Sequence, residues 1–125
     1  MKKESGMFKT SYAEVEAYVT KDGSEIRELM HPLRHGNLAQ SLAEAIVAPG
    51  KKTMLHRHRT TEEIYHVTHG RGTMTLGVET FEVGLGDTIC IPPGIPHCIE
   101  NSGRNPLRIL CACTPAYSDT DTDLL

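Results

Sequence analysis

Tryptophan is absent from the sequence and phenylalanine occurs only twice, so aliphatic side chains must fill the interior of the protein. The 125 residues suit one domain with a single core. The chain also lacks an excess of positive charge, and its net charge of −3 argues against a nucleic-acid-binding surface. No apolar run follows Lys2 and Lys3, which argues against a secretory signal or a membrane span. We therefore expect a cytoplasmic protein that binds neither nucleic acid nor membranes.

Cysteine pairs at zinc-ribbon spacing are missing as well. In a cytoplasmic chain without CxxC pairs, the cysteines are expected to be reduced and mostly buried: Cys90, Cys98, Cys111 and Cys113. Cys111 and Cys113 would share one face of a strand, so the alternative that one of these thiols lies near a pocket stays open. The sequence contains no phosphate-binding loop, HExxH or nucleophile-elbow motif, and it gives no support to those classes of enzyme.

Glycine and proline interrupt the chain at short intervals, with 11 and 7 residues respectively. Short β-prone runs lie between them, at 15–20, 25–30, 41–48, 52–58, 63–69, 73–77, 80–83, 87–92, 97–101 and 107–113. Many short strands at near-regular spacing predict an all-β sandwich or barrel. A helix over residues 11–19 is the less favoured alternative for the N-terminal segment. Residues 117–125 either fray or lie across a neighbouring surface.

The stretch HRHRTTEEIYHVTHG, residues 56–70, is rich in histidine. His56 and His58 are two residues apart, so in a strand they point to one face while Arg57 points to the other. This spacing fits a pair of metal ligands, but it also fits two surface histidines. A carboxylate from Glu62 or Glu63 could join them only if the chain turns at residues 59–62. Because adjacent strand residues face opposite sides, only one of the two glutamates can point inward.

Two longer patterns contain these residues. The first is Gly50, His56-x-His58, Glu63 and Gly70, and the second is Gly86, Pro92-x-Gly94, His97 and Asn101. With residues 71–85 between them, they resemble the two signature motifs of the cupin superfamily. The resemblance implies an all-β double-stranded β-helix, or jelly-roll, barrel. It places the barrel at residues 41–115, N-terminal strands or an arm of the same domain at 1–40, and a C-terminal tail at 116–125.

The same resemblance implies a metal site, whose ligands would be His56, His58, Glu63 and His97. Three neutral imidazoles and one carboxylate suit one divalent transition-metal ion, for which Zn, Fe, Mn, Ni, Co and Cu all stay open. Four protein ligands on an octahedral ion leave two positions for water or substrate. A structural zinc site would instead use all four positions of a tetrahedron.

Other side chains are candidates for the wall of the pocket. Tyr65 shares the Glu63 face, where it either packs in the core or places a hydroxyl near the metal as a candidate catalytic group. Met54 has the same parity as His56 and Phe81 alternates with polar neighbours, so both are expected to line the interior. His66 should lie outside the barrel, and His69 adjoins the turn at Gly70, where parity is lost.

The segment MHPLRHG, residues 30–36, is expected to be an ordinary loop, with capping of a pocket as the alternative. An open metal site favours a metal-dependent enzyme acting on a small oxygen-rich substrate. By resemblance, this would be a sugar or uronate isomerase or lyase, or a dioxygenase if the ion is iron. A non-catalytic, metal-dependent binding or sensing module is the alternative. The resemblance also implies a homodimer.

Overall fold

The computed structural model describes residues 8–125, so residues 1–7 of the predicted N-terminal segment lie outside the described residues. The strands are β1 (Tyr18–Val19), β2 (Glu25–Met30), β3 (Ser41–Val47), β4 (His56–His58), β5 (Glu62–His69), β6 (Arg71–Leu76), β7 (Glu79–Gly84), β8 (Thr88–Ile91), β9 (His97–Asn101), β10 (Leu107–Thr114) and β11 (Thr122–Leu124). The helical elements are η1 (Tyr12–Glu14), α1 (Pro32–His35) and η2 (Asp119–Asp121).

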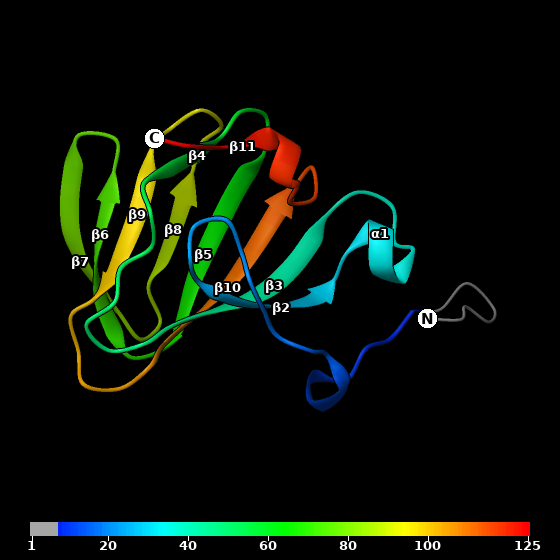
Figure 1. Cartoon of the computed structure of the whole chain (residues 1–125), viewed down its shortest axis with the longest axis horizontal. Helices are drawn as coiled ribbons and strands as arrows, with labels where there is room; N and C mark the ends of the chain where they lie inside the picture. Colours follow the sequence, from blue (N-terminus) through cyan, green and yellow to red (C-terminus); the bar gives the residue numbers. More distant parts are fainter. Residues whose placement is uncertain (1–7) are drawn as a thin grey trace.

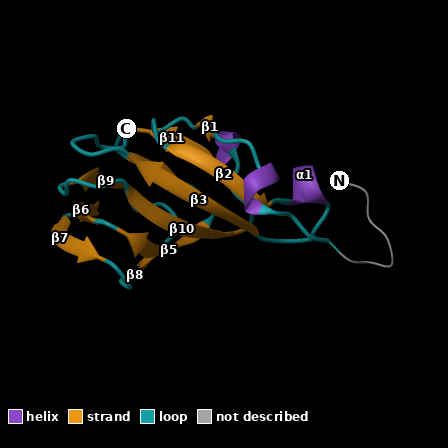
Figure 2. Ribbon diagram, turned by 90° about the horizontal axis from the view of Figure 1, so that it is seen from below, coloured by secondary structure: helices purple, strands orange, loops and turns teal. Residues whose placement is uncertain are grey.

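The strands form two antiparallel sheets. One is six-stranded with the order β1-β2-β3-β10-β5-β8, and the other is five-stranded with the order β11-β4-β9-β6-β7 (Figure 1). Figure 2 shows β6 and β7 at one end of the molecule and α1 at the other. The predicted all-β double-stranded β-helix is therefore confirmed. The helix considered over residues 11–19 is reduced to the short η1, followed by β1.

Alternation along the strands determines which side chains enter the barrel. In β5, Glu63, Tyr65 and Val67 are buried, whereas the residues that alternate with them are exposed: Glu62, Ile64 and His66. The core between the sheets is aliphatic, as the scarcity of aromatic residues requires; its largest fully buried apolar side chains are Met74, Ile91, Ile99, Leu107, Ile109 and Val67. Burial of each such side chain stabilises the folded state by about 1.5–3 kcal/mol. The register of β5 thereby directs a carboxylate inward beside the core.

The C-terminal tail crosses the barrel rather than fraying. β11 pairs with β4, with Thr122 opposite His58 (Figure 1). The Asp121 carboxylate accepts hydrogen bonds from the backbone N–H groups of Thr60 (3.0 Å) and Thr61 (3.1 Å). The sequence left two alternatives for the tail, fraying or lying across a neighbouring surface. The structure has the second, and the surface is the strand that bears His56 and His58.

A backbone hydrogen bond from a glycine connects the loop of the second motif to the strand of the first motif. Gly94 has a φ of +82°, a conformation that glycine adopts without steric cost, and its N–H donates to the His58 carbonyl at 2.7 Å. The chain then enters β9, where His97 is registered opposite His56. In the part of the chain that the structure describes, no helix has the length and apolar character needed to cross a bilayer.

Candidate metal centre

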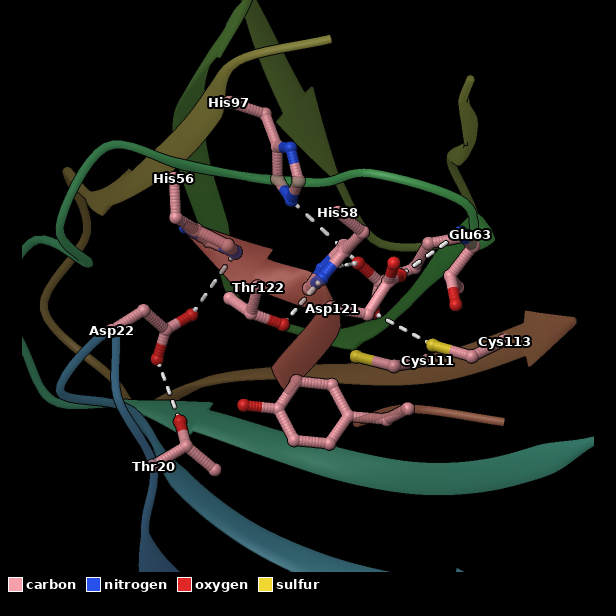
Figure 3. A network of polar contacts seen from close by, with 12 residues as sticks. Thr20, Asp22, His56, His58, Glu63, His97, Cys111, Cys113, Asp121 and Thr122 are labelled. Carbon is pink, nitrogen blue, oxygen red and sulfur yellow. Dashed lines mark hydrogen bonds and ion pairs between the residues drawn. The ribbon is translucent and has the colours of Figure 1, made fainter. Parts of the chain in front are cut away.

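Three histidines from two strands meet inside the barrel. His56 and His58 come from β4 and His97 from β9, and their exposed fractions are 3%, 4% and 0%. Each offers one ring nitrogen, and these nitrogens all lie within 4.8 Å of one another. Figure 3 shows the three rings converging. The arrangement requires the pairing of β4 with β9, which brings together residues that are far apart in the sequence.

The other ring nitrogen of each histidine is used by the barrel wall. Nδ1 of His56 lies 2.7 Å from the Met54 carbonyl, and Nδ1 of His97 lies 3.0 Å from the Ile95 carbonyl. Because a carbonyl oxygen only accepts, each Nδ1 must carry a proton and donate it. In the neutral tautomer, the lone pair of each Nε2 then faces the interior.

His58 is oriented in the same way by the tail. Its Nδ1 lies 2.9 Å from Thr122 Oγ1, and that hydroxyl donates its own proton to the Ser118 carbonyl at 2.8 Å. Thr122 therefore accepts from His58, so Nδ1 is protonated and Nε2 presents a lone pair inward. Hydrogen bonds of this kind fix the ring orientation of metal-ligating histidines.

Glu63 lies beside these nitrogens. Its Oε1 is 3.1 Å from His58 Nε2 and 3.6 Å from His97 Nε2 (Figure 3). The Cys113 thiol donates to Oε2 at 3.3 Å. Burial alone would raise the pKa of Glu63, but the contacts with His58 and His97 outweigh it and lower this pKa to about 2. The carboxylate is thus held ionised in the interior.

The three ring nitrogens lie close enough to hold one ion, and Glu63 Oε1 lies beside two of them, those of His58 and His97. When the His58 ring is neutral and protonated at Nδ1, its Nε2 and Glu63 Oε1 are two acceptors in contact. This contact is favourable only when a cation, either a proton or a metal ion, lies between the two atoms. His97 Nε2 is fully buried and has no hydrogen-bond partner. The residues therefore fit a divalent cation, and a donor set of imidazoles and a carboxylate suits a first-row transition ion.

A pocket opens from this cluster between β2, β3, β5 and β10. Tyr65 lines the pocket, with its ring 6.1 Å from the His97 ring in a T-shaped contact. Burial and, secondarily, the charge of Glu63 raise the pKa of Tyr65 well above its usual value. Its phenol group therefore keeps its proton at neutral pH and can only act as a neutral donor or acceptor.

Two predicted wall residues lie elsewhere. Met54 is 56% exposed, so its expected place in the pocket is wrong: β4 begins only at His56, and strand parity does not extend back to residue 54. Phe81 pairs with Met74 across β6 and β7 and packs against the aliphatic core, so it does not line the pocket either. His66 and His69 are exposed, and neither lies near the cluster.

Two acidic pocket residues were missed from the sequence. Asp22 lies in the turn between β1 and β2, and its Oδ2 is 3.5 Å from His56 Nε2. No local pattern distinguishes this aspartate from an ordinary turn residue, because its place depends on a contact with Met54, whose N–H donates to the Asp22 carbonyl at 2.8 Å. Glu28 is 4% exposed in β2, on the same face as Ile26, so strand parity alone could have found it.

The segment 30–36 supports the tail beside the pocket. His31 precedes α1, where its Nδ1 accepts a hydrogen bond from the Leu33 N–H at 3.1 Å. Its Nε2 donates to the Tyr117 carbonyl at 2.8 Å. The Tyr117 ring in turn packs edge-on against His58, with 5.7 Å between ring centroids. Through Tyr117, the segment therefore supports the pocket wall, and it is not an isolated loop.

Comparisons with known proteins agree with this geometry. The family model described as "Cupin domain" matches residues 43–113. The chain is 57% identical over 119 residues to the uncharacterized protein MJ1618 of Methanocaldococcus jannaschii, covering 95% of each chain. The structure of the polyketide cyclase RemF from Streptomyces resistomycificus is similar with a TM-score of 0.75 and 27% identity, over 86% of this chain and 79% of that one.

The structure of oxalate decarboxylase from Bacillus subtilis at pH 4.6 superposes with a TM-score of 0.81 at 21% identity. The match covers 95% of this chain but only 32% of the decarboxylase, so this chain spans about a third of that protein. The fold and the buried cluster define a jelly-roll barrel whose three histidines can hold a metal ion. The chain belongs to the cupin domain family.

Proposed function

We propose that the protein binds one divalent transition-metal ion through His56, His58, His97 and Glu63 and acts as an isomerase- or lyase-type enzyme on a small oxygen-rich molecule. One observation carries the proposal: three inward-facing ring nitrogens lie within 4.8 Å of one another beside a buried carboxylate, and His97 Nε2 has no hydrogen-bond partner. When bound, such an ion supplies Lewis-acid polarisation of a carbonyl or hydroxyl oxygen.

The protein's own groups supply orientation and proton transfer. Tyr65 is a protonated phenol on the pocket wall and is our candidate catalytic residue, as a hydrogen-bond donor to a substrate oxygen. Asp22 is a pocket carboxylate outside the proposed ligand set. Its Oδ2 lies 3.5 Å from His56 Nε2, at the edge of the histidine cluster. A carboxylate in this position can accept a proton from a carbon or hydroxyl group beside the polarised carbonyl.

The likeness to the polyketide cyclase RemF, at 27% identity over most of both chains, supports chemistry on oxygen-rich carbon skeletons. Removal of a proton next to a carbonyl is a step common to isomerases and lyases. A chain that only binds its ligand would not accelerate this step. A non-catalytic binding or sensing module is therefore the alternative that an experiment must separate.

The test measures the exchange of carbon-bound hydrogen of a small sugar with deuterium from the solvent. Tag-free protein loaded with Zn²⁺ is mixed with dihydroxyacetone in D₂O, and loss of the methylene proton signals is followed by NMR. The proposal predicts exchange above the rate with metal-free protein, together with its loss in Tyr65→Phe or Asp22→Asn. Binding of the sugar without faster exchange would support the binding module instead.

We also propose that the protein acts as a homodimer in the cytoplasm. An apolar row crosses the outer face of the six-stranded sheet, where Leu42, Ala112, Ile64 and Cys90 are successive cross-strand neighbours. Leu42 is 39% exposed and Ile64 40%. Burial of this row against a second copy would remove it from water. The four unpaired thiols support a reducing compartment.

A further inference from the structure

The pocket that adjoins the metal centre is acidic. Three carboxyl groups line it, those of Asp22, Glu28 and Glu63, and no lysine or arginine is found among its lining residues in the described part of the chain. Arg34 lies in the adjoining groove, where its guanidinium group stacks on the outer side of Tyr18, 4.9 Å from the ring centroid. The Arg34 guanidinium does not line the pocket; it lies beyond the Tyr18 ring, where its charge opposes the effect of burial on the pKa of Tyr18 and of Glu28.

Asp22 is held in one orientation. Its Oδ1 accepts hydrogen bonds from Thr20 Oγ1 at 2.8 Å, from the Ser24 N–H at 2.9 Å and from Ser24 Oγ at 2.7 Å. These bonds leave Oδ2 pointing toward His56 (Figure 3). The carboxylate is therefore a fixed acceptor beside the centre, and it does not have to reorganise when a ligand arrives.

The charges of the site nearly cancel. A divalent ion with three neutral imidazoles and the Glu63 carboxylate carries one net positive charge, and Asp22 cancels it. Burial raises the pKa of Glu28, which favours its neutral form, and the Tyr18 hydroxyl donates to Glu28 Oε2 at 3.3 Å. Among the described residues that line the pocket, no lysine or arginine adds positive charge that would attract an anionic ligand.

A separate observation shows that this acidic wall belongs to a binding site. His97 Nε2 is fully buried, aims into the cluster and has no hydrogen-bond partner, since Glu63 Oε1 lies 3.6 Å away. Two members of this wall, Asp22 and Glu63, contact the histidine cluster that contains this nitrogen, which distinguishes the wall from acidic side chains in contact only with solvent and with one another.

We infer that the pocket selects uncharged hydroxycarbonyl compounds over the corresponding carboxylates, with Asp22 Oδ2 accepting a hydrogen bond from the ligand hydroxyl. This inference rests on the proposed function, because the two ligand oxygens would have to reach the metal centre. It narrows the substrate class: neutral, sugar-like or polyketide-like molecules are accepted, whereas uronates and small dicarboxylates are disfavoured.

The test compares two molecules of nearly the same shape. Hydroxyacetone and glycolate are both hydroxycarbonyl chelators, but glycolate carries a carboxylate in place of the acetyl group. The chain is loaded with Co²⁺, loading is measured from the visible absorption of the ion, and each molecule is then titrated while that absorption is followed. In the wild-type protein, hydroxyacetone should bind at least as tightly as glycolate, although a divalent ion in water prefers the anion.

The Asp22→Asn variant removes one negative charge but keeps an oxygen acceptor. It should raise the affinity for glycolate about tenfold or more, and change that for hydroxyacetone by about threefold at most. Glu62→Gln is the matched control, because it removes the same charge from the exposed face of β5. It should leave both affinities unchanged.

The outcomes separate this inference from the proposed function. A chain that takes up no Co²⁺ overturns both. A loaded wild-type chain that prefers glycolate, or that binds neither molecule, overturns the inference and leaves the metal site standing. Loss of Co²⁺ from Asp22→Asn also overturns it, because Asp22 would then be a metal ligand rather than an acceptor for the substrate.

Discussion

Each pocket histidine donates a hydrogen bond outward through Nδ1 and presents Nε2 inward. Two of the acceptors are the carbonyls of Met54 and Ile95, each two residues before the histidine that it orients. The chain thus positions these rings with its own local backbone. The third acceptor, Thr122, comes from the tail and lies 64 residues from His58.

The first prediction concerns the two adjacent glutamates. Glu63→Ala should lower metal affinity by more than the roughly 10–100-fold that is typical of losing an outer-shell partner, because Glu63 is a proposed ligand facing the cluster while Glu62 faces solvent. Glu62→Ala should bind metal as the wild type does. Competition with a chromogenic chelator measures both affinities. If Glu62→Ala loses the metal and Glu63→Ala keeps it, the ligand assignment in β5 is wrong.

Strand parity predicted the orientation of Glu63, Tyr65 and His66 because these residues lie within one regular strand. It failed for Met54, which precedes β4, and it gave no information on Asp22, which lies in a turn. Parity is a local rule. Residues whose position depends on contacts between distant segments are outside its reach.

The second prediction concerns Glu28. Its pKa in the folded protein is raised above the usual value of 4.5, mainly by burial. Such a group contributes stability that is fully present below the unfolded-state pKa and is lost as pH rises through the folded-state pKa. Glu28→Gln does not ionise, so its free energy of unfolding relative to wild type should rise from pH 4 to pH 8.

Urea denaturation of chelator-treated protein across this pH range measures the difference. Glu62→Gln serves as the control on the exposed face of β5. A Glu28→Gln difference that is constant with pH, or that falls as pH rises, would contradict the sign of the shift.

At the scale of elements, β11 is the strand that the sequence did not predict. It has only three residues and its sequence, TDL, has no alternating pattern long enough to recognise. Its pairing with β4 instead depends on contacts such as those of Asp121 with Thr60 and Thr61. The longer strands were predicted because glycine and proline turns separate β-prone runs.

The third prediction follows from the position of β11. Thr122→Val keeps the shape of the side chain but removes the acceptor for His58 Nδ1. Metal affinity should fall by about 10–100-fold, while the circular dichroism spectrum stays unchanged. Thr120→Val, in the exposed part of the same tail, is the control. Equal effects of the two variants would show that the tail acts on the site only through general stability.

At the scale of the whole molecule, the double-stranded β-helix could be predicted because both signature motifs are present in the sequence. The pairing of β4 with β9 then follows from the fold and brings His97 to His56. The acidic character of the pocket could not be predicted in this way. It arises where the turn before β2 and the face of β2 pack over the motif residues.

The fourth prediction concerns association. Ile64→Arg places a charge in the middle of the apolar row on the six-stranded sheet and should convert a dimer into a monomer in sedimentation velocity experiments. Val78→Arg is the control, since Val78 is fully exposed in the turn between β6 and β7. A wild-type protein that sediments as a monomer would contradict the proposed interface.

The most direct test of the metal centre is the metal content of tag-free protein after dialysis, measured by elemental analysis for the wild type, His97→Ala and His66→Ala. His97 lies in the cluster, whereas His66 is exposed on the outer face of β5. The wild type and His66→Ala should each retain about one transition-metal ion per chain, and His97→Ala should retain less than about a tenth of that amount. A wild-type protein without bound transition metal, or a His97→Ala variant that retains as much as the wild type, would contradict the central claim.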